Sequence, residues 1–334
     1  MDPQHLNIAL IAGGYSGEME VSLRSQEGLL HFLSDSPHTI YPMLITHQEW
    51  SVSLPSGEKV PVHKDDFSIH TPQGKHIKFD FAYITIHGTP GENGLLTGYL
   101  DMLRIPYSCC STLVSALTFD KYVCNRYLST FGIRTTSGIR LGRHDTPSVQ
   151  SILRQVPLPV FVKPCNGGSS VATHKVVDEA NLLPAIQDAL KEDVQVLIER
   201  VVQGTEVTCG CYRDDSGIHT LPVTEVVSRN EFFDYDAKYN GAVEEITPAR
   251  ISSELTAEIQ SLTSRVYTIL QAQGIIRIDY IIHEDKPYLL EVNTTPGMTA
   301  TSFIPQQIRA AGLKIGEVLD SIITYIIHYH SSQL

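Results

Sequence analysis

The chain has 334 residues, of which 42% are hydrophobic and 19% charged, a composition typical of a globular protein. Its formal net charge of −12 argues against a nucleic-acid or anionic-membrane partner, so a bound anion must be held by local groups. No window reaches the roughly 18 apolar residues of a membrane span, and the N-terminus lacks the basic stretch of a signal peptide.

The length exceeds the size at which one hydrophobic core keeps growing, so we expect two or three domains. The six cysteines show no paired CxxC spacing. They are predicted to be buried or incidental thiols of a protein in a reducing cytoplasm. These six are Cys109, Cys110, Cys124, Cys165, Cys209 and Cys211.

A strand is predicted over residues 6–12, followed by the glycine-rich run 13–18 and a helix from about Glu20. A strand, a glycine turn and a helix N-terminus together form a place that can hold an anionic group. The spacing is not the GxGxxG dinucleotide fingerprint, so a tight turn without a ligand fits the same residues.

A second buried strand is predicted over residues 79–86, followed by a loop, 87–94, with three glycines and one proline. Open α/β sheets bind ligands at the carboxyl ends of their strands, which is where this loop lies. His87 opens the loop, and both a functional and a structural role remain open for it.

The middle of the chain predicts a helix over 111–127 and a strand over 158–164 that ends near Lys163. The strand enters the run Gly167-Gly168-Ser169-Ser170. A lysine charge beside backbone N–H groups and hydroxyls suits phosphate binding. In the Walker pattern the lysine follows the glycines, so this is a different arrangement, and a surface hairpin is the alternative.

A helix over 178–192 and a strand over 194–198 come next, and the strand ends on Glu199, which could hydrogen-bond an adenine or ribose. Residues 228–250 lack periodicity but are rich in aromatics, which predicts a lid over a site. A helix is predicted from Ser253 and closes at Gly274. From residue 304 onward, two helices broken near Gly312 are expected.

The stretches 275–282 and 288–293 alternate apolar and polar residues, which predicts two strands joined by the loop 283–287. If Ile282 faces Tyr288, four polar side chains share one face, with Asp279 opposite Glu291 and Arg277 opposite Asn293. Carboxylate and amide oxygens are ligands that Mg²⁺ prefers when it also holds phosphate. A solvated sheet face is the alternative.

Taken together, these motifs resemble those of the D-alanine–D-alanine ligases of the ATP-grasp superfamily, in the same order along nearly the whole chain. The loop 87–94 resembles the family's HGxxGEDG motif. Departures are Asn93 for the usual Asp, Cys165-Asn166 after Lys-Pro, and Phe303 where many members carry Leu. The other matching segments are 13–18, 120–121, 162–164, 168–171, 235–239, 277–279 and 291–299.

The resemblance implies a mixed α/β, three-domain ATP-grasp fold. An open α/β substrate domain over 1–111 would be followed by a central subdomain over 112–198. A C-terminal subdomain over 199–334 would contain the mobile loop 228–250 and the metal hairpin 275–293. ATP would lie between the central and C-terminal subdomains. Family members are usually dimers, so a homodimer is expected.

The resemblance also implies the chemistry: ATP phosphorylates one D-alanine carboxylate, and the amine of a second D-alanine attacks the acylphosphate. Two Mg²⁺ or Mn²⁺ ions would be held by Asp279, Glu291 and Asn293. The residues implied for ATP are Lys121, Lys163, Ser170, Glu199, Val201, Glu206, Phe232 and Lys238.

By the same resemblance, Glu18 would hold the ammonium of the first D-alanine. Arg277 and the Gly297 N–H would stabilise the tetrahedral oxyanion. Ser302 would take the carboxylate of the second D-alanine. A hydrogen-bonded set around the attacking amine would consist of Glu18, Ser169 and Tyr239. Further substrate contacts are expected from Val21, Ser22, His87 and Phe303.

Two other functions remain open from the sequence. A D-alanine–D-lactate ligase, or another ATP-grasp ligase, would need the same ATP and metal residues. A nucleotide-binding module without turnover would not need Glu18 together with the complete set of lysines and metal ligands.

Overall fold

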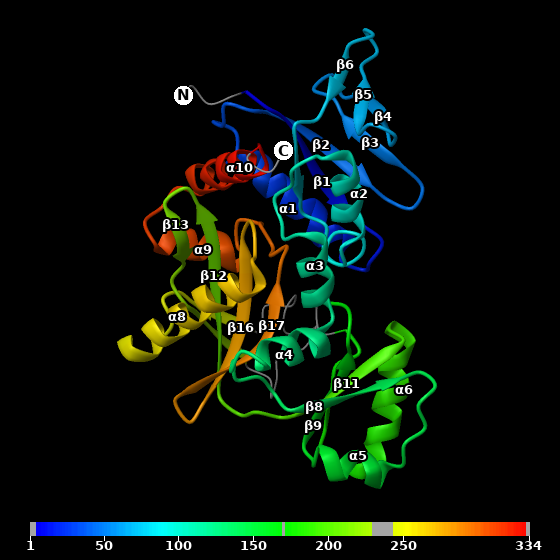
Figure 1. The fold of residues 1–334 in the computed structure, drawn as a ribbon, viewed down its shortest axis with the longest axis vertical. Coiled ribbons are helices and arrows are strands. Elements are labelled where there is room, and N and C mark those ends of the chain that lie inside the picture. Colours follow the sequence, from blue (N-terminus) through cyan, green and yellow to red (C-terminus); the bar gives the residue numbers. More distant parts are fainter. Residues whose placement is uncertain (1–4, 169–170, 229–242, 332–334) are drawn as a thin grey trace.

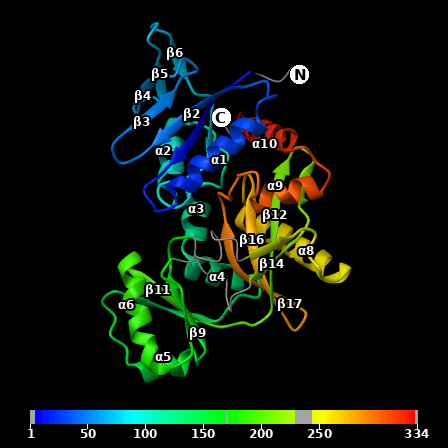
Figure 2. The same cartoon turned by 180° about the vertical axis from the view of Figure 1, so that it is seen from behind.

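The computed structural model describes residues 5–168, 171–228 and 243–331. In that part of the chain, three β-sheets follow one another along the sequence, each with helices packed against it (Figures 1 and 2). The mixed α/β class predicted from the sequence is therefore confirmed.

The first sheet has the order β6-β5-β4-β3-β2-β1-β7, and β1 pairs in parallel with β2 and β7. β1 is buried on both faces, as a central parallel strand requires. Helices α1 (Met19–Phe32) and α10 (Ile315–Ser331) share a core with one face, and α2 (Leu95–Leu103) with the other. The strands are β1 (Asn7–Gly13), β2 (Thr39–Ile45), β3 (Trp50–Ser53), β4 (Lys59–His63), β5 (Ser68–His70), β6 (His76–Lys78) and β7 (Phe81–Ile84).

The second sheet is antiparallel, in the order β10-β9-β11-β8, and packs against helices α5 and α6. Its strands are β8 (Gly138–Gly142), β9 (Val160–Pro164), β10 (His174–Val176) and β11 (Gln195–Arg200). The helices are α5 (Val149–Gln155), a short 3-10 turn (Glu179–Asn181) and α6 (Leu182–Glu192), so the helix expected over 178–192 begins with that turn.

The third sheet is also antiparallel, in the order β15-β14-β12-β16-β17, with β13 pairing β12. Helix α8 (Ser253–Leu270) shares a core with it, and α9 (Phe303–Ala310) contacts β12. The strands are β12 (Thr205–Asp214), β13 (Gly217–Thr220), β14 (Thr224–Ser228), β15 (Val243–Ile246), β16 (Ile276–His283) and β17 (Lys286–Asn293). The two C-terminal helices expected on either side of Gly312 are confirmed as α9 and α10.

The single helix predicted over 111–127 is wrong, because the chain forms two helices there. These are α3 (Thr112–Phe119) and α4 (Lys121–Ser129). Asp120 separates them in an extended conformation, and its carboxylate accepts a hydrogen bond from Val123 N at 2.9 Å. Aspartate is a favoured N-cap, and this cap places Lys121 at the first position of the new helix.

The β16–β17 hairpin turns more tightly than predicted. His283 pairs with Lys286 across a two-residue turn, whose residues Glu284 and Asp285 both have positive φ. Ile282 therefore faces Pro287 and not Tyr288. A bulge beside Asp279 then shifts the register by one residue.

This bulge restores the predicted pairing at the far end of the hairpin. Asp279 faces Glu291 and Arg277 faces Asn293, as expected from the sequence. Along β16 the odd-numbered positions are half-buried, whereas the even-numbered ones lie in the core. The four polar side chains therefore share the face turned away from that core.

Helix α8 ends earlier than the expected closure at Gly274. Gln271 adopts the left-handed conformation that ends the helix. Gly274 lies in the next loop, also with positive φ, where a Cβ would stand 1.8 Å from the Ser108 carbonyl oxygen. This glycine is therefore required by a close approach to the α2–α3 connection and not by helix capping.

The stretch 228–250 is partly regular, contrary to prediction. Its last part forms β15, which pairs antiparallel with β14. Arg250 and Glu225 then form two side-chain hydrogen bonds of 2.9 Å. Residues 229–242, the centre of the predicted lid, lie outside the described residues.

All six cysteines are free and buried, as predicted. Burial raises the pKa of Cys124 and of Cys165 to about 12, so both thiols stay protonated and unreactive at neutral pH. Within the described residues, none of the helices is both long enough and apolar enough to cross a lipid bilayer.

Candidate active site

A cavity of about 1620 Å³ is lined by residues of all three sheets and their loops. The second sheet contributes the end of β9 and the glycine loop after it, together with the end of β11. The third sheet contributes β12, β14, β16 and β17, and the first sheet contributes loops 15–18 and 88–93. Ten residues predicted for the site line this cavity: Glu18, Lys121, Lys163, Glu199, Val201, Glu206, Arg277, Asp279, Glu291 and Phe303.

Lys163 is fixed at the end of β9 by an ion pair with Glu199 on the neighbouring strand β11, at 2.5 Å. Burial alone would lower the pKa of Lys163, but the Glu199 carboxylate, reinforced by Glu291, more than offsets burial and holds the pKa above its usual value. Thr136 donates a hydrogen bond to the other Glu199 oxygen. The lysine is therefore charged, and Glu199 is held from two sides.

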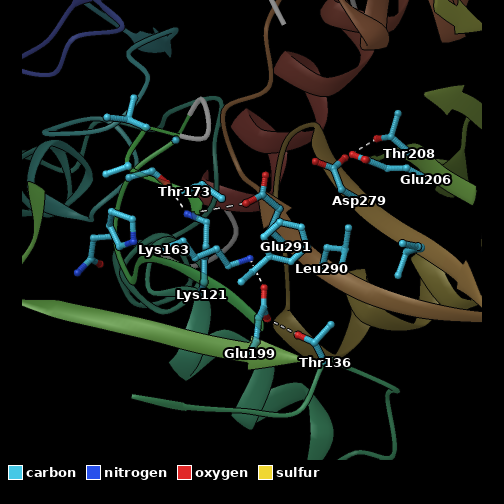
Figure 3. Close-up of a pocket in the computed structure, with 18 of the residues that line it drawn as sticks. Lys121, Thr136, Lys163, Thr173, Glu199, Glu206, Thr208, Asp279, Leu290 and Glu291 are labelled. Atoms are coloured by element: carbon cyan, nitrogen blue, oxygen red, sulfur yellow. Dashed lines mark hydrogen bonds and ion pairs between the residues drawn. The ribbon is translucent and has the colours of Figure 1, made fainter. Parts of the chain in front are cut away.

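Lys121, at the start of α4, reaches the same part of the cavity from another direction. Its Nζ lies 3.8 Å from Glu291 Oε2 on β17 and donates to the Gly167 carbonyl oxygen. Figure 3 shows Lys121 and Lys163 between Glu199 and Glu291. Two ammonium groups in one cavity supply the local positive charge that an acidic protein needs to bind a polyphosphate.

Asp279 is the centre of a hydrogen-bonded cluster on the β16–β17 face. Arg277 binds both of its carboxylate oxygens, with Nε at 2.8 Å and Nη2 at 2.7 Å. Thr208 on β12 donates to Oδ1 at 2.6 Å, and Asn293 donates to Oδ2 at 3.2 Å. The hairpin register thus brings Arg277, Asp279 and Asn293 into direct contact, as the sequence predicted.

The donor set fits a metal ion that is shared with phosphate. Asp279, Glu291 and Asn293 offer hard oxygen ligands, and Mg²⁺ is usually held by one or two carboxylates plus substrate phosphates. Among the described residues, no group of three or more His, Cys, Asp or Glu side chains is arranged to hold a metal ion by itself. These three side chains therefore suit a metal that arrives with a nucleotide.

Glu18 lies where the first sheet meets the glycine loop of the second. A Cβ on Gly168 would stand 2.9 Å from Glu18 Oε2, and a Cβ on Gly88 would stand 3.9 Å from it. Gly168 is therefore the residue that allows the loop to approach this carboxylate. The Ser16 hydroxyl accepts from Glu18 N at 3.3 Å and donates to the His87 carbonyl oxygen at 2.9 Å, which ties the two first-sheet loops together.

His87 is almost completely buried, and its Nε2 has no hydrogen-bond partner among the residues that the structure describes. Burial lowers its pKa, a change opposed by Glu18 and reinforced by Arg277. A neutral imidazole with an unpartnered buried nitrogen beside Glu18 is consistent with a substrate pocket. This observation favours a functional His87 over a purely structural one.

Glu92 is a titratable residue of this site that the sequence reasoning did not single out. Its carboxylate accepts a hydrogen bond from Gly88 N at 2.7 Å. Burial raises the pKa of Glu92 to about 7; Glu18 and Glu291 reinforce the shift, and Lys121 opposes it. The run 87–94 indicated the loop but not the raised pKa of Glu92, because burial in the folded protein and charges from distant segments cause that shift.

The raised pKa of Glu92 predicts a pH-dependent effect on stability. Between about pH 4.5 and 7 the folded protein holds a proton that the unfolded chain has lost, so stability falls as the pH rises. Glu92→Gln cannot ionise and should escape this loss, which is on the order of 2 kcal/mol between about pH 5 and 7.5. In the absence of nucleotide and divalent cation, the melting temperature of the variant minus that of the wild type should increase by several degrees as the pH rises through this range. A gap between the two proteins that does not change with pH would contradict the prediction.

The loop before α9 carries the residues predicted for the second substrate. Ser302 is the N-cap residue of α9, and its Oγ accepts from Thr299 N at 3.1 Å. A Cβ on Gly297 would stand 2.9 Å from Ser302 Oγ, so this glycine allows the loop to fold back on itself. The Phe303 ring lies under the Arg277 guanidinium at 5.3 Å.

Six predicted site residues do not line the cavity, and five have no described position. The Ser22 hydroxyl is fully buried and accepts from Gly13 N at 3.0 Å, so it supports the turn after β1. Val21, His87, Asn293, Gly297 and Ser302 belong to elements or loops next to the cavity without lining it. Ser169, Ser170, Phe232, Lys238 and Tyr239 lie outside the described residues.

The sequence reasoning also missed Thr136 and Thr208, which support Glu199 and Asp279. A lone threonine in a strand or loop carries no signal, since its role comes from strands paired across the sheet. Asn166, one of the differences from the family motif, has a clear structural role. Its backbone and side chain both donate to Asp193, at 2.8 and 2.9 Å, which fixes the start of the glycine loop.

Comparisons with known proteins find similar chains over nearly the whole sequence. A family model described as "D-ala D-ala ligase N-terminus" matches residues 7–110, and one described as "D-ala D-ala ligase C-terminus" matches residues 128–324. The D-alanine–D-alanine ligase of Porphyromonas gingivalis W83 is 59% identical over 318 residues, which cover 95% of this chain and 96% of that protein. The corresponding ligase of Parabacteroides distasonis is 54% identical with the same coverage.

Solved structures of similar proteins cover nearly the whole chain as well. The VanG D-Ala:D-Ser ligase from Enterococcus faecalis aligns with a TM-score of 0.85 at 29% identity, covering 97% of this chain and 100% of that one. The D-alanine–D-alanine ligase from Bacillus anthracis complexed with ATP aligns with a TM-score of 0.79 at 27% identity. That match covers 98% of this chain and 100% of the other.

Proposed function

This chain belongs to the D-alanine–D-alanine ligase family, and we propose that its large cavity binds ATP together with two Mg²⁺ or Mn²⁺ ions. Its fold is the ATP-grasp fold of that family. It is an ATP-dependent ligase that joins two D-alanines into D-alanyl-D-alanine for peptidoglycan synthesis. One observation supports the site assignment: lysines from two elements and the carboxylates of Asp279 and Glu291 on a hairpin face line the same cavity, with Asn293 hydrogen-bonded to Asp279 beside it.

In the first step, the carboxylate of one D-alanine attacks the γ-phosphorus of ATP, so the bond to the β-phosphate oxygen breaks and ADP leaves. The product is D-alanyl phosphate. Lys121 and Lys163, and Lys238 by resemblance, neutralise the phosphates, while Glu199 and Glu206 bind the adenine and ribose. The metal ions, when bound, neutralise charge on the phosphate oxygens and hold them in place.

In the second step, the amine of the other D-alanine attacks the acyl carbon of D-alanyl phosphate. The new C–N bond forms a tetrahedral oxyanion, which expels phosphate; one proton of the amine ends on the released phosphate, and the dipeptide remains. Glu18 holds the first substrate through its ammonium, next to His87 and Val21. Arg277 and the Gly297 N–H stabilise the oxyanion, because a fixed positive charge and an N–H face the developing negative charge.

The remaining assignments follow the family resemblance. Ser302 binds the carboxylate of the second D-alanine, beside Phe303, and Val201 and Phe232 lie against the adenine. Ser22 supports the first-substrate loop. Ser169 and Tyr239, with Glu18, orient the attacking amine, and Ser170 contacts phosphate.

Three further proposals concern the whole molecule. The domains are 1–111, 112–198 and 199–334; the three sheets support this division, although β11 crosses the second boundary by two residues. The protein works in the cytoplasm without nucleic acid or membrane, which its acidic charge and free thiols support. It is a homodimer, and Met102 on α2 is 78% exposed on a face that a second copy could cover. Analytical ultracentrifugation giving a monomer mass would exclude the dimer.

The decisive experiment for function is phosphate release from ATP in the presence of Mg²⁺. We expect release to depend on D-alanine, to be absent with L-alanine, and to yield D-alanyl-D-alanine by mass spectrometry. D-Serine is included as a second substrate because a D-Ala:D-Ser ligase is among the structural neighbours, and D-lactate because a depsipeptide ligase would use it. Phosphate release that ignores D-alanine, or a preference for D-lactate at neutral pH, would contradict the proposal.

A further inference from the structure

Two side chains of α9 hold the loop that leads into this helix. Arg309 Nη1 donates to the Ala300 carbonyl oxygen at 2.8 Å, and Gln306 Nε2 donates to the Thr301 carbonyl oxygen at 2.7 Å. Ser302 follows directly and begins the helix, where Gln306 N donates to its carbonyl oxygen at 3.2 Å. Successive carbonyls of the loop are therefore fixed by the helix that carries the substrate-binding serine at its start.

Besides its bond to the loop, the Gln306 side chain contacts the third sheet. The same Nε2 donates to Glu245 Oε2 at 2.5 Å, and Glu245 lies on β15 of the third sheet. The positive charge of Arg277 acts on this Glu245 carboxylate. One carboxamide thus links the loop before Ser302 to a strand at the edge of the sheet that carries the reaction centre.

The other end of the loop is fixed to the first sheet instead. Met298 N donates to Ser25 Oγ on α1 at 3.2 Å, and a Cβ on Gly28 of the same helix would stand 2.4 Å from Met298 O. Arg309 lies over the Phe32 ring of α1 at 5.9 Å. Gln306 therefore ties the Ser302 end of the loop to β15, whereas its neighbour Gln307 fixes the helix α9 itself to β12 and β14.

We propose that Gln306 is a positioning residue for the second D-alanine, because it holds Thr301 against Glu245 and thereby sets the place of Ser302. This inference rests on the proposed role of Ser302 in binding the second carboxylate. Gln306 itself touches no reacting atom. A hydroxyl that recognises a carboxylate must sit within hydrogen-bonding distance, so a displacement of about 1 Å weakens binding severely.

The test compares single variants by their dependence on D-alanine. Gln306→Leu removes both donated bonds and leaves an apolar side chain that is one atom shorter. We expect the KM for the second D-alanine to rise about 10-fold, since a shift of this size corresponds to the loss of one or two well-placed hydrogen bonds. The KM for ATP, the KM for the first D-alanine and the melting temperature should change little, which a merely structural role would not predict.

A charge-exchange pair tests the contact with Glu245 directly. Gln306→Glu sets two carboxylates against each other and should raise the KM for the second D-alanine further than Gln306→Leu does. Adding Glu245→Gln to Gln306→Glu restores a donor and an acceptor at this contact, so part of the loss should be recovered. No recovery would overturn the role given to Glu245.

Two control variants separate the possible failures. Gln260→Leu is matched in chemistry, because Gln260 Nε2 also donates to a backbone carbonyl, that of Leu221, at 3.1 Å. It lies on α8 and should leave both KM values for D-alanine unchanged. Ser302→Ala should raise the KM for the second D-alanine. If it does so while Gln306→Leu stays within about twofold of wild type, the positioning role is wrong and the proposed site stands. If Ser302→Ala has no effect, the subsite assignment fails, and the positioning role fails with it.

Discussion

Glu291→Ala should lower kcat for D-alanine-dependent phosphate release at least about 1000-fold, equivalent to about 4 kcal/mol of transition-state stabilisation. Glu291 faces Asp279 across the hairpin and lies 3.8 Å from the Lys121 ammonium, so it is placed to join the metal and the phosphates. Its side chain is only 26% exposed, yet its backbone remains paired in β17, so the fold should survive. Circular dichroism and phosphate release measure these two consequences separately.

A matched control comes from the same hairpin. Glu284 lies in the two-residue turn with its side chain 80% exposed. Glu284→Ala removes the same charge from the same supersecondary unit and should leave kcat within about twofold of wild type. Near-normal turnover in Glu291→Ala, with a folded protein, would remove the metal assignment.

Arg277→Lys should lower kcat about 100- to 1000-fold with a much smaller effect on the KM for ATP. The guanidinium spans both oxygens of Asp279 and is stacked on Phe303, two contacts that a lysine ammonium cannot reproduce together. A lysine at this position still carries the positive charge that neutralises Asp279. The loss of kcat would therefore reflect the poorer placement of that charge at the oxyanion, and not the cost of an unpaired buried carboxylate. The effect should therefore appear in kcat, since the oxyanion forms only in the transition state.

The control is Arg134→Lys, an identical substitution at a surface ion pair. Arg134 pairs with Glu258 at 2.7 Å, with both side chains more than 40% exposed. Exposed pairs contribute little, so this variant should keep wild-type rates. If Arg277→Lys retained more than about a third of wild-type kcat, Arg277 would act on the position of Asp279 and not on the oxyanion.

The sequence predicted the structure best in the β16–β17 hairpin, where apolar and polar residues alternate along two strands on either side of a short loop. The pattern around Asp279 and Glu291 identified the shared face correctly. The predicted pairing of Ile282 with Tyr288 is wrong, because the two-residue turn shifts the register by one residue. The bulge beside Asp279 shifts it back by one residue. The two errors cancel at the functional end, where the polar side chains need to face one another.

The break between α3 and α4 could have been predicted, because aspartate is a favoured residue at the start of a helix and Asp120 interrupts an otherwise apolar run.

Other parts of the site could not be predicted from the sequence, because they depend on contacts between residues far apart along the chain. The raised pKa of Glu92 comes first from its burial, and the charges that reinforce it, Glu18 and Glu291, are far away along the chain. The contact between Gln306 and Glu245 likewise joins a helix to a strand 61 residues away.

The hydrogen bonds at Asp279 also refine how the metal must bind. Arg277, Thr208 and Asn293 already occupy both of its oxygens. A cation bound at Asp279 would therefore have to displace one of these donors. Glu291, whose Oε2 lies 3.8 Å from the Lys121 ammonium, would be the second carboxylate ligand.

We propose that the β16–β17 face holds the metal ions that neutralise the ATP phosphates. Anomalous X-ray scattering from crystals grown with Mn²⁺ and a non-hydrolysable ATP analogue measures this directly. Two manganese peaks should lie between the phosphates and the side chains of Asp279, Glu291 and Asn293, and the peak nearest Glu291 should vanish in Glu291→Ala. Manganese bound to the nucleotide at a distance from all three side chains would contradict the account.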